Sequence, residues 1–261
     1  MSYHLDTGPD LQVITPEWPA PRGVRAAFTL RTGGVSVAPY DSLNLGARIG
    51  DSAEAGAENR RRVREKLRLP AEPVWLEQVH GIEVVELGAV VVTGDSRGRT
   101  ADASVARGAG RVCAIRVADC MPVLFAARDG SAVGAAHAGW RGLAGGVLEA
   151  TIGRLGVPAT ELIAWMGPAI GPKHFEVGED VRAAFTATDA GATSAFVANA
   201  RGRWQCDLYA LARRRLSAIG VSGIYGGGWC TFAEAGRFFS YRRDGQCGRM
   251  AALIWIEPGR G

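Results

Sequence analysis

The sequence predicts an α+β fold in which mixed β-sheets are flanked by helices, and three observations lead to this prediction. Runs typical of strands outnumber those typical of helices, and the two kinds do not alternate regularly, which disfavours a doubly wound β-α-β arrangement. Of the 261 residues 47% are hydrophobic, enough for a sizeable core. No repeat or low-complexity linker marks a boundary, so we expect residues 1–261 to form a single domain.

Three segments have the periodicity and the end signals of helices: 53–69, 142–155 and 207–219. Asp51 or Ser52 can cap the first of them, and Pro70 stops it. Asp207 caps the third, and Gly220 follows its last turn as a C-terminal stop.

Short apolar runs between these helices predict six strands: 83–87, 112–118, 122–127, 132–137, 162–166 and 251–256. Two polar side chains lie where such strands end. Cys120 falls between two of the runs, and His137 is the last residue of another. Functional sites are commonly built at strand ends and turns, so both residues become candidates.

Composition and the lack of certain motifs argue against several classes of protein. The net charge of +4 and a pI near 9.0 are compatible with anionic small molecules or nucleic acid but too small to choose between them. No membrane span, secretory signal or P-loop motif is visible. The five cysteines are irregularly spaced, which favours free thiols in a cytoplasmic protein over a disulfide framework.

His80, Cys120 and His137 are the best candidate metal ligands. Two imidazoles and one thiolate suffice for a zinc site with a fourth position open for water. Their spacings of 40 and 17 residues require the tertiary fold to assemble the site. The plainer alternatives are a small buried cysteine and satisfied polar histidines.

Other residues leave more than one role open. Asp102 and Asp119 could orient histidines, act as bases or cap turns. Arg31, Arg242 and Arg243 could clamp an anion or simply be solvated. Ala136, Ala138 and Gly139 surround His137, and their small size could admit a substrate or let two sheets pack closely.

A metal-free cysteine hydrolase, with Cys120 as nucleophile and His137 as base, is a further alternative to the metal site.

Motifs along nearly the whole chain resemble the YfiH-type family: FTLRTGGVS, SLNLG, EQVHG, ADCMPVLF, AAHAGWRG, GPAIGPKHFEVG and FFSYRRDGQCGRMAALIW. This family has been labelled multicopper polyphenol oxidase or laccase and is better described as purine nucleoside phosphorylases with adenosine deaminase and methylthioadenosine phosphorylase activity. Lys173 and His174 stand where relatives often carry cysteine. The resemblance also implies a fold distantly like that of bacterial toxin deamidases.

The resemblance implies zinc held by His80, Cys120 and His137, which we also take as the catalytic residues. It implies phosphorolysis of adenosine, inosine, guanosine and methylthioadenosine, and deamination of adenosine by water activated at the metal. We assign Arg31, Asn44 and Arg242 to substrate and phosphate binding. The expected partners are nucleosides and phosphate, without nucleic acid or membrane, and the oligomeric state stays open.

The laccase label can be tested by counting ligands. A trinuclear copper cluster needs several histidines beyond His80 and His137, and only His4 and His174 remain. A true multicopper oxidase is therefore excluded. Copper loaded in vitro could still give some polyphenol oxidase activity, because copper outcompetes zinc at sites with nitrogen and sulfur ligands.

Overall fold

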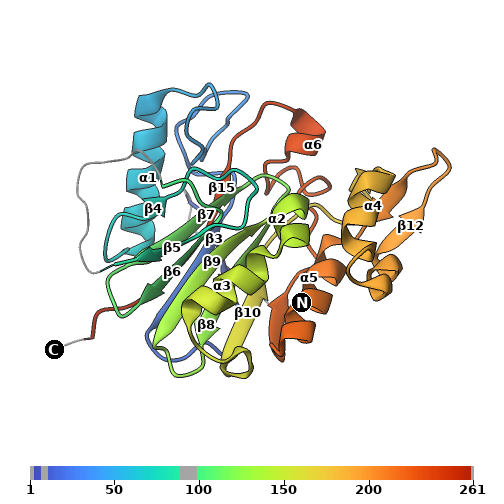
Figure 1. The fold of residues 1–261 in the computed structure, drawn as a ribbon. Coiled ribbons are helices and arrows are strands. Elements are labelled where there is room, and N and C mark those ends of the chain that lie inside the picture. Colours follow the sequence, from blue (N-terminus) through green and yellow to red (C-terminus); the bar gives the residue numbers. More distant parts are fainter. Residues whose placement is uncertain (1–2, 7–10, 89–98, 260–261) are drawn as a thin grey trace.

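Two six-stranded β-sheets packed face to face form the centre of the computed structural model, which describes residues 3–6, 11–88 and 99–259 (Figure 1). The strand order is β1-β2-β3-β15-β7-β4 in the first sheet and β14-β10-β8-β9-β6-β5 in the second. Facing side chains, among them Ile115, Leu124 and Ile254, form one buried cluster between the sheets. Both sheets are mixed, since β4 pairs in parallel with β7, and β5 with β6.

The first sheet contains β1 (Tyr3–Asp6), β2 (Val13–Pro16), β3 (Val24–Thr29), β4 (Val74–Trp75), β7 (Val112–Val117) and β15 (Met250–Ile256). The second contains β5 (Val84–Leu87), β6 (Ala103–Arg107), β8 (Met121–Ala127), β9 (Ala132–Ala138), β10 (Leu162–Met166) and β14 (Gly223–Gly226). A small third sheet has the order β11 (Glu176–Val177), β13 (Trp204–Cys206), β12 (Phe196–Ala198).

Helices cover the outer faces of both large sheets and give the molecule four layers. On the first sheet, Val63 of α1 (Ala53–Leu67) packs with Ala114 and Leu253. On the second, α3 (Val147–Leu155) and α5 (Leu208–Ile219) share a buried cluster with Val123 and Phe125. Strands β8 and β9 are consequently buried on both faces, which explains their continuous apolar sequences.

The remaining helical segments are α2 (Trp140–Gly145), α4 (Glu179–Thr186), α6 (Tyr241–Asp244) and two 3-10 turns, Ala159–Glu161 and Ala190–Ala195. The prediction of one helix over 142–155 was wrong. Gly146 has φ 101°, a left-handed conformation that ends α2 and precedes α3. An apolar periodicity carries no sign of such a break, because both helices bury the same side.

The other predicted elements are confirmed. Each of the six predicted strands is present with ends shifted by at most one residue. Ser52 caps α1 by accepting the Ala55 N–H, and Asp207 caps α5 by accepting the Ala210 N–H. The strands that the sequence missed are mostly short, with two to six residues each. None of the helices in the described part of the chain has the length and apolar character needed to cross a bilayer.

Candidate metal centre

Three side chains from separate segments converge where the two large sheets meet at one end. Cys120 lies in the turn from β7 to β8, His137 lies in β9, and His80 lies in the loop between β4 and β5. One potential ligand atom of each lies within 4.8 Å of those of the other two. Cys120 Sγ is 3.8 Å from His80 Nε2, and the two imidazole rings meet edge to face. The fold thus brings together the three residues that the sequence singled out.

A single carboxylate anchors both histidines. Asp102, which precedes β6 and is 0% exposed, accepts the backbone N–H groups of Val79, His80 and Gly81 at 2.7 to 3.1 Å. Its Oδ1 also lies 2.7 Å from His137 Nδ1. His80 has φ 62°, an unusual conformation for a residue other than glycine, and these hydrogen bonds hold it there. With Nδ1 occupied by Asp102, His137 keeps Nε2 for a metal.

Charges in the cluster favour a thiolate at Cys120. Desolvation by the surrounding protein raises the pKa of the Cys120 thiol, but His137 and His80 outweigh it and lower that pKa to about 6. Desolvation disfavours the charged form of His137 too and so lowers its pKa. Cys120 and Asp102 outweigh this effect and raise the pKa of His137 to about 9. The thiolate is the form of cysteine that binds metals and attacks electrophiles.

Gly139 leaves space for the candidate ligands themselves. A Cβ atom at this position would lie 2.8 Å from Cys120 Sγ and 3.1 Å from His80 Cδ2. An added side chain would therefore collide with two members of the cluster, and the idea that this space admits substrate stays a prediction. Ala136 and Ala138 are 0% exposed and belong to the core between β9 and the helices, so their small size serves packing.

Asp119 is next to Cys120 in the chain, but its carboxylate accepts hydrogen bonds from other segments than the carboxylate of Asp102 does. Its Oδ1 accepts the Thr231 hydroxyl at 2.6 Å, and its Oδ2 accepts the Arg242 N–H at 2.7 Å. Its carbonyl accepts the Ile170 N–H at 3.0 Å. Of the roles left open by the sequence, Asp119 takes that of a turn anchor, because it ties three segments together beside the cluster.

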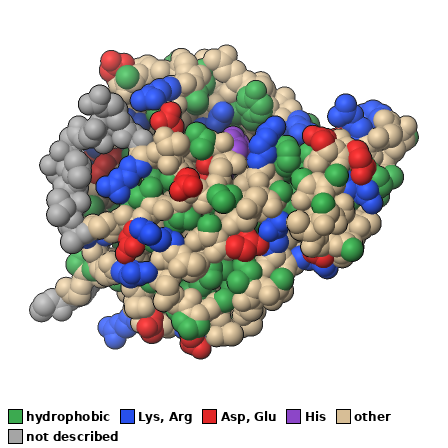
Figure 2. All heavy atoms as spheres, viewed as in Figure 1, with side chains coloured by type: hydrophobic (Ala, Val, Ile, Leu, Met, Phe, Trp, Pro, Cys, Tyr) green, Lys and Arg blue, Asp and Glu red, His purple; other side chains and the backbone are tan. Residues whose placement is uncertain are grey.

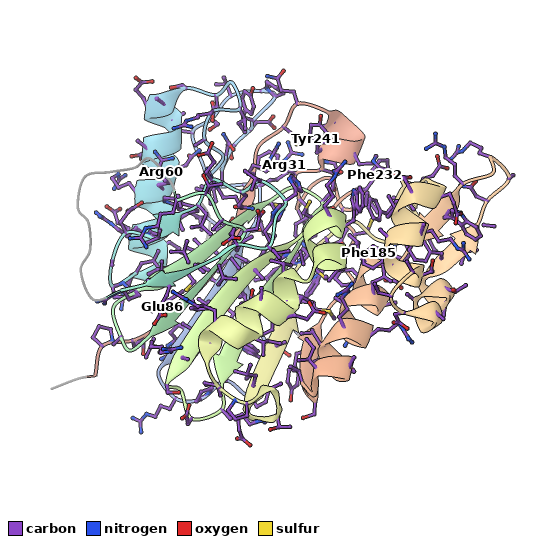
Figure 3. All side chains as sticks on the ribbon, viewed as in Figure 1. Arg31, Arg60, Glu86, Phe185, Phe232 and Tyr241 are labelled. Carbon is purple, nitrogen blue, oxygen red and sulfur yellow. The ribbon has the colours of Figure 1, made fainter. Side chains whose placement is uncertain are left out.

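The two arginines assigned to phosphate differ in how their guanidinium groups are held. Arg31, labelled in Figure 3, donates to the carbonyls of Asp41 and Ala235 and lies over the Phe239 ring. Arg242 is exposed and donates to the Glu176 carbonyl at 2.9 Å. Contact of either with phosphate stays a prediction.

Asn44 and Arg243 are held by protein atoms. Asn44 is 0% exposed, donates to Asp51 at 2.7 Å and accepts the N–H groups of Gly46 and Arg249. Arg243 donates to the carbonyls of residues 231, 232 and 238. For Asn44 to touch a substrate, this hydrogen-bond network has to open, and its binding role stays a prediction.

The sequence missed a second contact between a cysteine and a histidine. Cys230 Sγ lies 3.3 Å from His174 Nδ1, at a cavity of about 600 Å³ between the 171–174 segment, α5 and residues 226–233. The two residues are 56 positions apart, and neither stands in a pattern that suggests a partner.

The donor set of the first cluster fits a zinc ion. In a tetrahedral site, a thiolate sulfur and an imidazole nitrogen lie about 3.6 Å apart, given the usual metal–ligand distances. The distance of 3.8 Å between Cys120 Sγ and His80 Nε2 is close to this value. Figure 2 shows a histidine side chain at the surface, with Lys or Arg side chains beside it. Because His80 is exposed, an ion held by the cluster can be reached from solvent.

Known proteins and a family model match this chain along almost its full length. Residues 25–257 match the family described as multi-copper polyphenol oxidoreductase laccase. A purine nucleoside phosphorylase of Pseudomonas aeruginosa is 56% identical, covering 94% of this chain and 98% of its own. Purine nucleoside phosphorylase YfiH of Escherichia coli K12 is 51% identical, covering 94% and 99%.

Solved structures of similar proteins have the same fold. A Neisseria meningitidis protein, NMB0706, superimposes with a TM-score of 0.89 at 49% identity and covers 94% of this chain and 99% of its own. YlmD of Geobacillus stearothermophilus does so with a TM-score of 0.86 at 34% identity, covering 92% and 94%. The more distant likeness to toxin deamidases stays a prediction.

Proposed function

This chain belongs to the family described as multi-copper polyphenol oxidoreductase laccase, to which YfiH proteins are assigned, and on that premise we propose that it is a zinc-dependent purine nucleoside phosphorylase. Its proposed substrates are adenosine, inosine, guanosine and methylthioadenosine with phosphate, and it also deaminates adenosine. The observation that carries the proposal is the convergence of His80, Cys120 and His137 around one anchoring carboxylate.

In this proposal His80, Cys120 and His137 hold the metal and Asp102 fixes the two imidazoles. When bound, zinc supplies Lewis acidity toward a water or a purine. The protein's own part is to keep three ligands in place and leave the fourth side open. Asp102 keeps two of the ligands in place, because it hydrogen-bonds to the His80 backbone and to the His137 ring.

Phosphorolysis requires phosphate to reach C1′ of the ribose while the base leaves. The phosphate oxygen bonds to C1′, the glycosidic bond breaks, and the base takes up a proton. We assign the phosphate to Arg31, Asn44 and Arg242. Arg242 is the most accessible of the three, since it is exposed.

Arg242→Ala is expected to raise the KM for phosphate by about tenfold and to change the KM for nucleoside less, because guanidinium–phosphate contacts are charge-assisted. Equal changes in both constants contradict this assignment.

A metal-free cysteine hydrolase is the second candidate. The lowered pKa of Cys120, about 6, favours it, because a thiolate beside an imidazole is a competent nucleophile. Chelation separates the two functions. A zinc enzyme loses activity when the metal is removed and regains it on reloading, whereas the thiol enzyme keeps its activity without metal.

The decisive experiment combines metal analysis with product analysis. Purified full-length protein is assayed for zinc and incubated with adenosine, inosine or guanosine, with and without phosphate. We expect about one zinc per chain. We also expect phosphate-dependent release of free base with ribose 1-phosphate, and inosine from adenosine in the absence of phosphate. Zinc-loaded protein that releases neither base nor inosine contradicts the proposal.

A further inference from the structure

Cys230 and His174 form a thiol–imidazole pair outside the candidate metal centre. The thiol sulfur lies 3.3 Å from His174 Nδ1, which can accept the thiol proton. The backbone N–H of Gly171 donates to the same sulfur at 3.3 Å. The His174 ring stacks on Phe232 with centroids 4.6 Å apart, which fixes its plane. The sulfur thus lies within hydrogen-bond distance of a base that can take its proton and of a backbone donor, which is the geometry that a thiol needs to attack an electrophile.

The accessibility of the five thiols sets this cysteine apart. Cys113, Cys206 and Cys247 are buried, whereas Cys120 and Cys230 are partly exposed. Cys120 belongs to the candidate metal centre, and a metal ligand is shielded from exchange by its metal. Cys230 is therefore the accessible thiol that the proposed function leaves unused.

The cavity beside Cys230 indicates which reagents can reach the sulfur. Its volume of about 600 Å³ is within the range of small-molecule sites. The charged side chains in its wall are Lys173, Arg213 and Asp207. Asp207 already accepts the Ala210 N–H as a helix cap. Two cations and one carboxylate leave an excess of one positive charge in this wall, which favours an anionic molecule.

We propose that Cys230 is a modification site, where the thiol exchanges with low-molecular-weight disulfides that carry carboxylates. His174 Nδ1 takes the thiol proton, and Sγ attacks one sulfur of the disulfide. A new S–S bond forms to Cys230 as the old S–S bond breaks, and the departing sulfur takes the proton from His174. The products are a mixed disulfide at Cys230 and one free thiol, so the cysteine is oxidised by the disulfide that is reduced.

Oxidised glutathione is the probe for this reaction. The full-length, metal-loaded protein is incubated with it and digested, and mass spectrometry measures mixed-disulfide formation at each cysteine peptide over time. We expect Cys230 to react first. His174→Asn is expected to slow the reaction at Cys230 by about tenfold, because the thiolate is the attacking form. Lys173→Glu is expected to slow oxidised glutathione by several-fold but not the neutral bis(2-hydroxyethyl) disulfide.

Each variant is checked for its melting temperature and zinc content, so that a misfolded protein is recognised. Equal rates at Cys230 in the parent and in His174→Asn, with both folded, overturn the proposal, as does a Cys230 peptide that remains unmodified. Because Cys120 and Cys230 lie on different peptides, a failure of the metal assignment appears at Cys120 alone and is distinguishable from a failure here.

Discussion

Cysteine meets histidine at two separate places among the described residues, at Cys120 and at Cys230, and the surroundings of the two places differ. At the first, His137 is 4% exposed and tied to the buried Asp102, which also holds the loop of His80. At the second, His174 is partly exposed and held by stacking on Phe232. The first arrangement fixes side chains for an ion, and the second leaves a sulfur open to small molecules. The comparison teaches that the anchor, more than the residue types, sets what each pair can do.

Replacing the candidate ligands gives the largest expected difference between the two sites. His80→Ala, Cys120→Ala and His137→Ala are each expected to reduce zinc from about one per chain to almost none, because a three-ligand site cannot lose a ligand. Cys230→Ser and His174→Asn are the matched controls and are expected to keep their zinc. Elemental analysis after gel filtration measures this. Full zinc content in two of the three ligand variants contradicts the assignment.

The anchor itself is tested by Asp102→Asn. The amide keeps the volume of the side chain but loses the negative charge. It also loses one of the two oxygens that accept hydrogen bonds from three backbone N–H groups and from His137. We expect zinc affinity to fall by about 10- to 100-fold, as for other groups that orient metal ligands. Competition with a chromophoric chelator measures the affinity.

Asp119→Asn is the matched control for this change, because Asp119 is also buried and binds Thr231 and Arg242 instead of a histidine. It is expected to cost about 1 to 3 kcal/mol of unfolding free energy and to leave zinc affinity nearly unchanged. Equal losses of zinc affinity in the two variants would show that Asp102 has no special part in the centre.

Gly139→Ala tests the space around the ligands. The added methyl group would lie 2.8 Å from Cys120 Sγ, and the crowding is expected to cost about 1 to 3 kcal/mol and to weaken zinc binding by about tenfold. Gly236→Ala is the control, because nothing lies within 4 Å of a Cβ there. Normal zinc affinity with lost nucleoside turnover would instead support the idea that this space admits substrate.

The smallest effect on the metal is expected from Thr231→Val, which cuts the hydrogen bond between the turn of Cys120 and the segment of Cys230. Valine fits the volume of the buried threonine but leaves Asp119 Oδ1 without this donor. Chemical denaturation is expected to show a loss of about 1 to 3 kcal/mol, while zinc affinity changes less than about twofold. A large loss of zinc would mean that the two regions are coupled through Asp119.

How far the sequence could lead is clear from particular residues. Cys120 and His137 were predictable because apolar runs place them at strand ends, where the fold collects side chains. An orienting role was open to both Asp102 and Asp119. The sequence could not show that Asp102 takes it, because three backbone amides reach its carboxylate through a loop in which His80 adopts φ 62°. Cys230 and His174 meet through tertiary folding alone. Gly146 could have continued a helix, but in the structure it adopts a left-handed conformation between α2 and α3.

The burial of β8 and β9 on both faces has a consequence for how such a protein changes over generations. Almost any substitution in these strands costs stability, so His137 in β9 is held in a part of the fold that tolerates little change. The loop of His80 is different: Val79 is 54% exposed and Ile82 is 42% exposed. Both flank a candidate ligand and carry little of the core. Substitutions that alter ligand preference are therefore expected to accumulate at these two positions, because new side chains there cost the fold little stability.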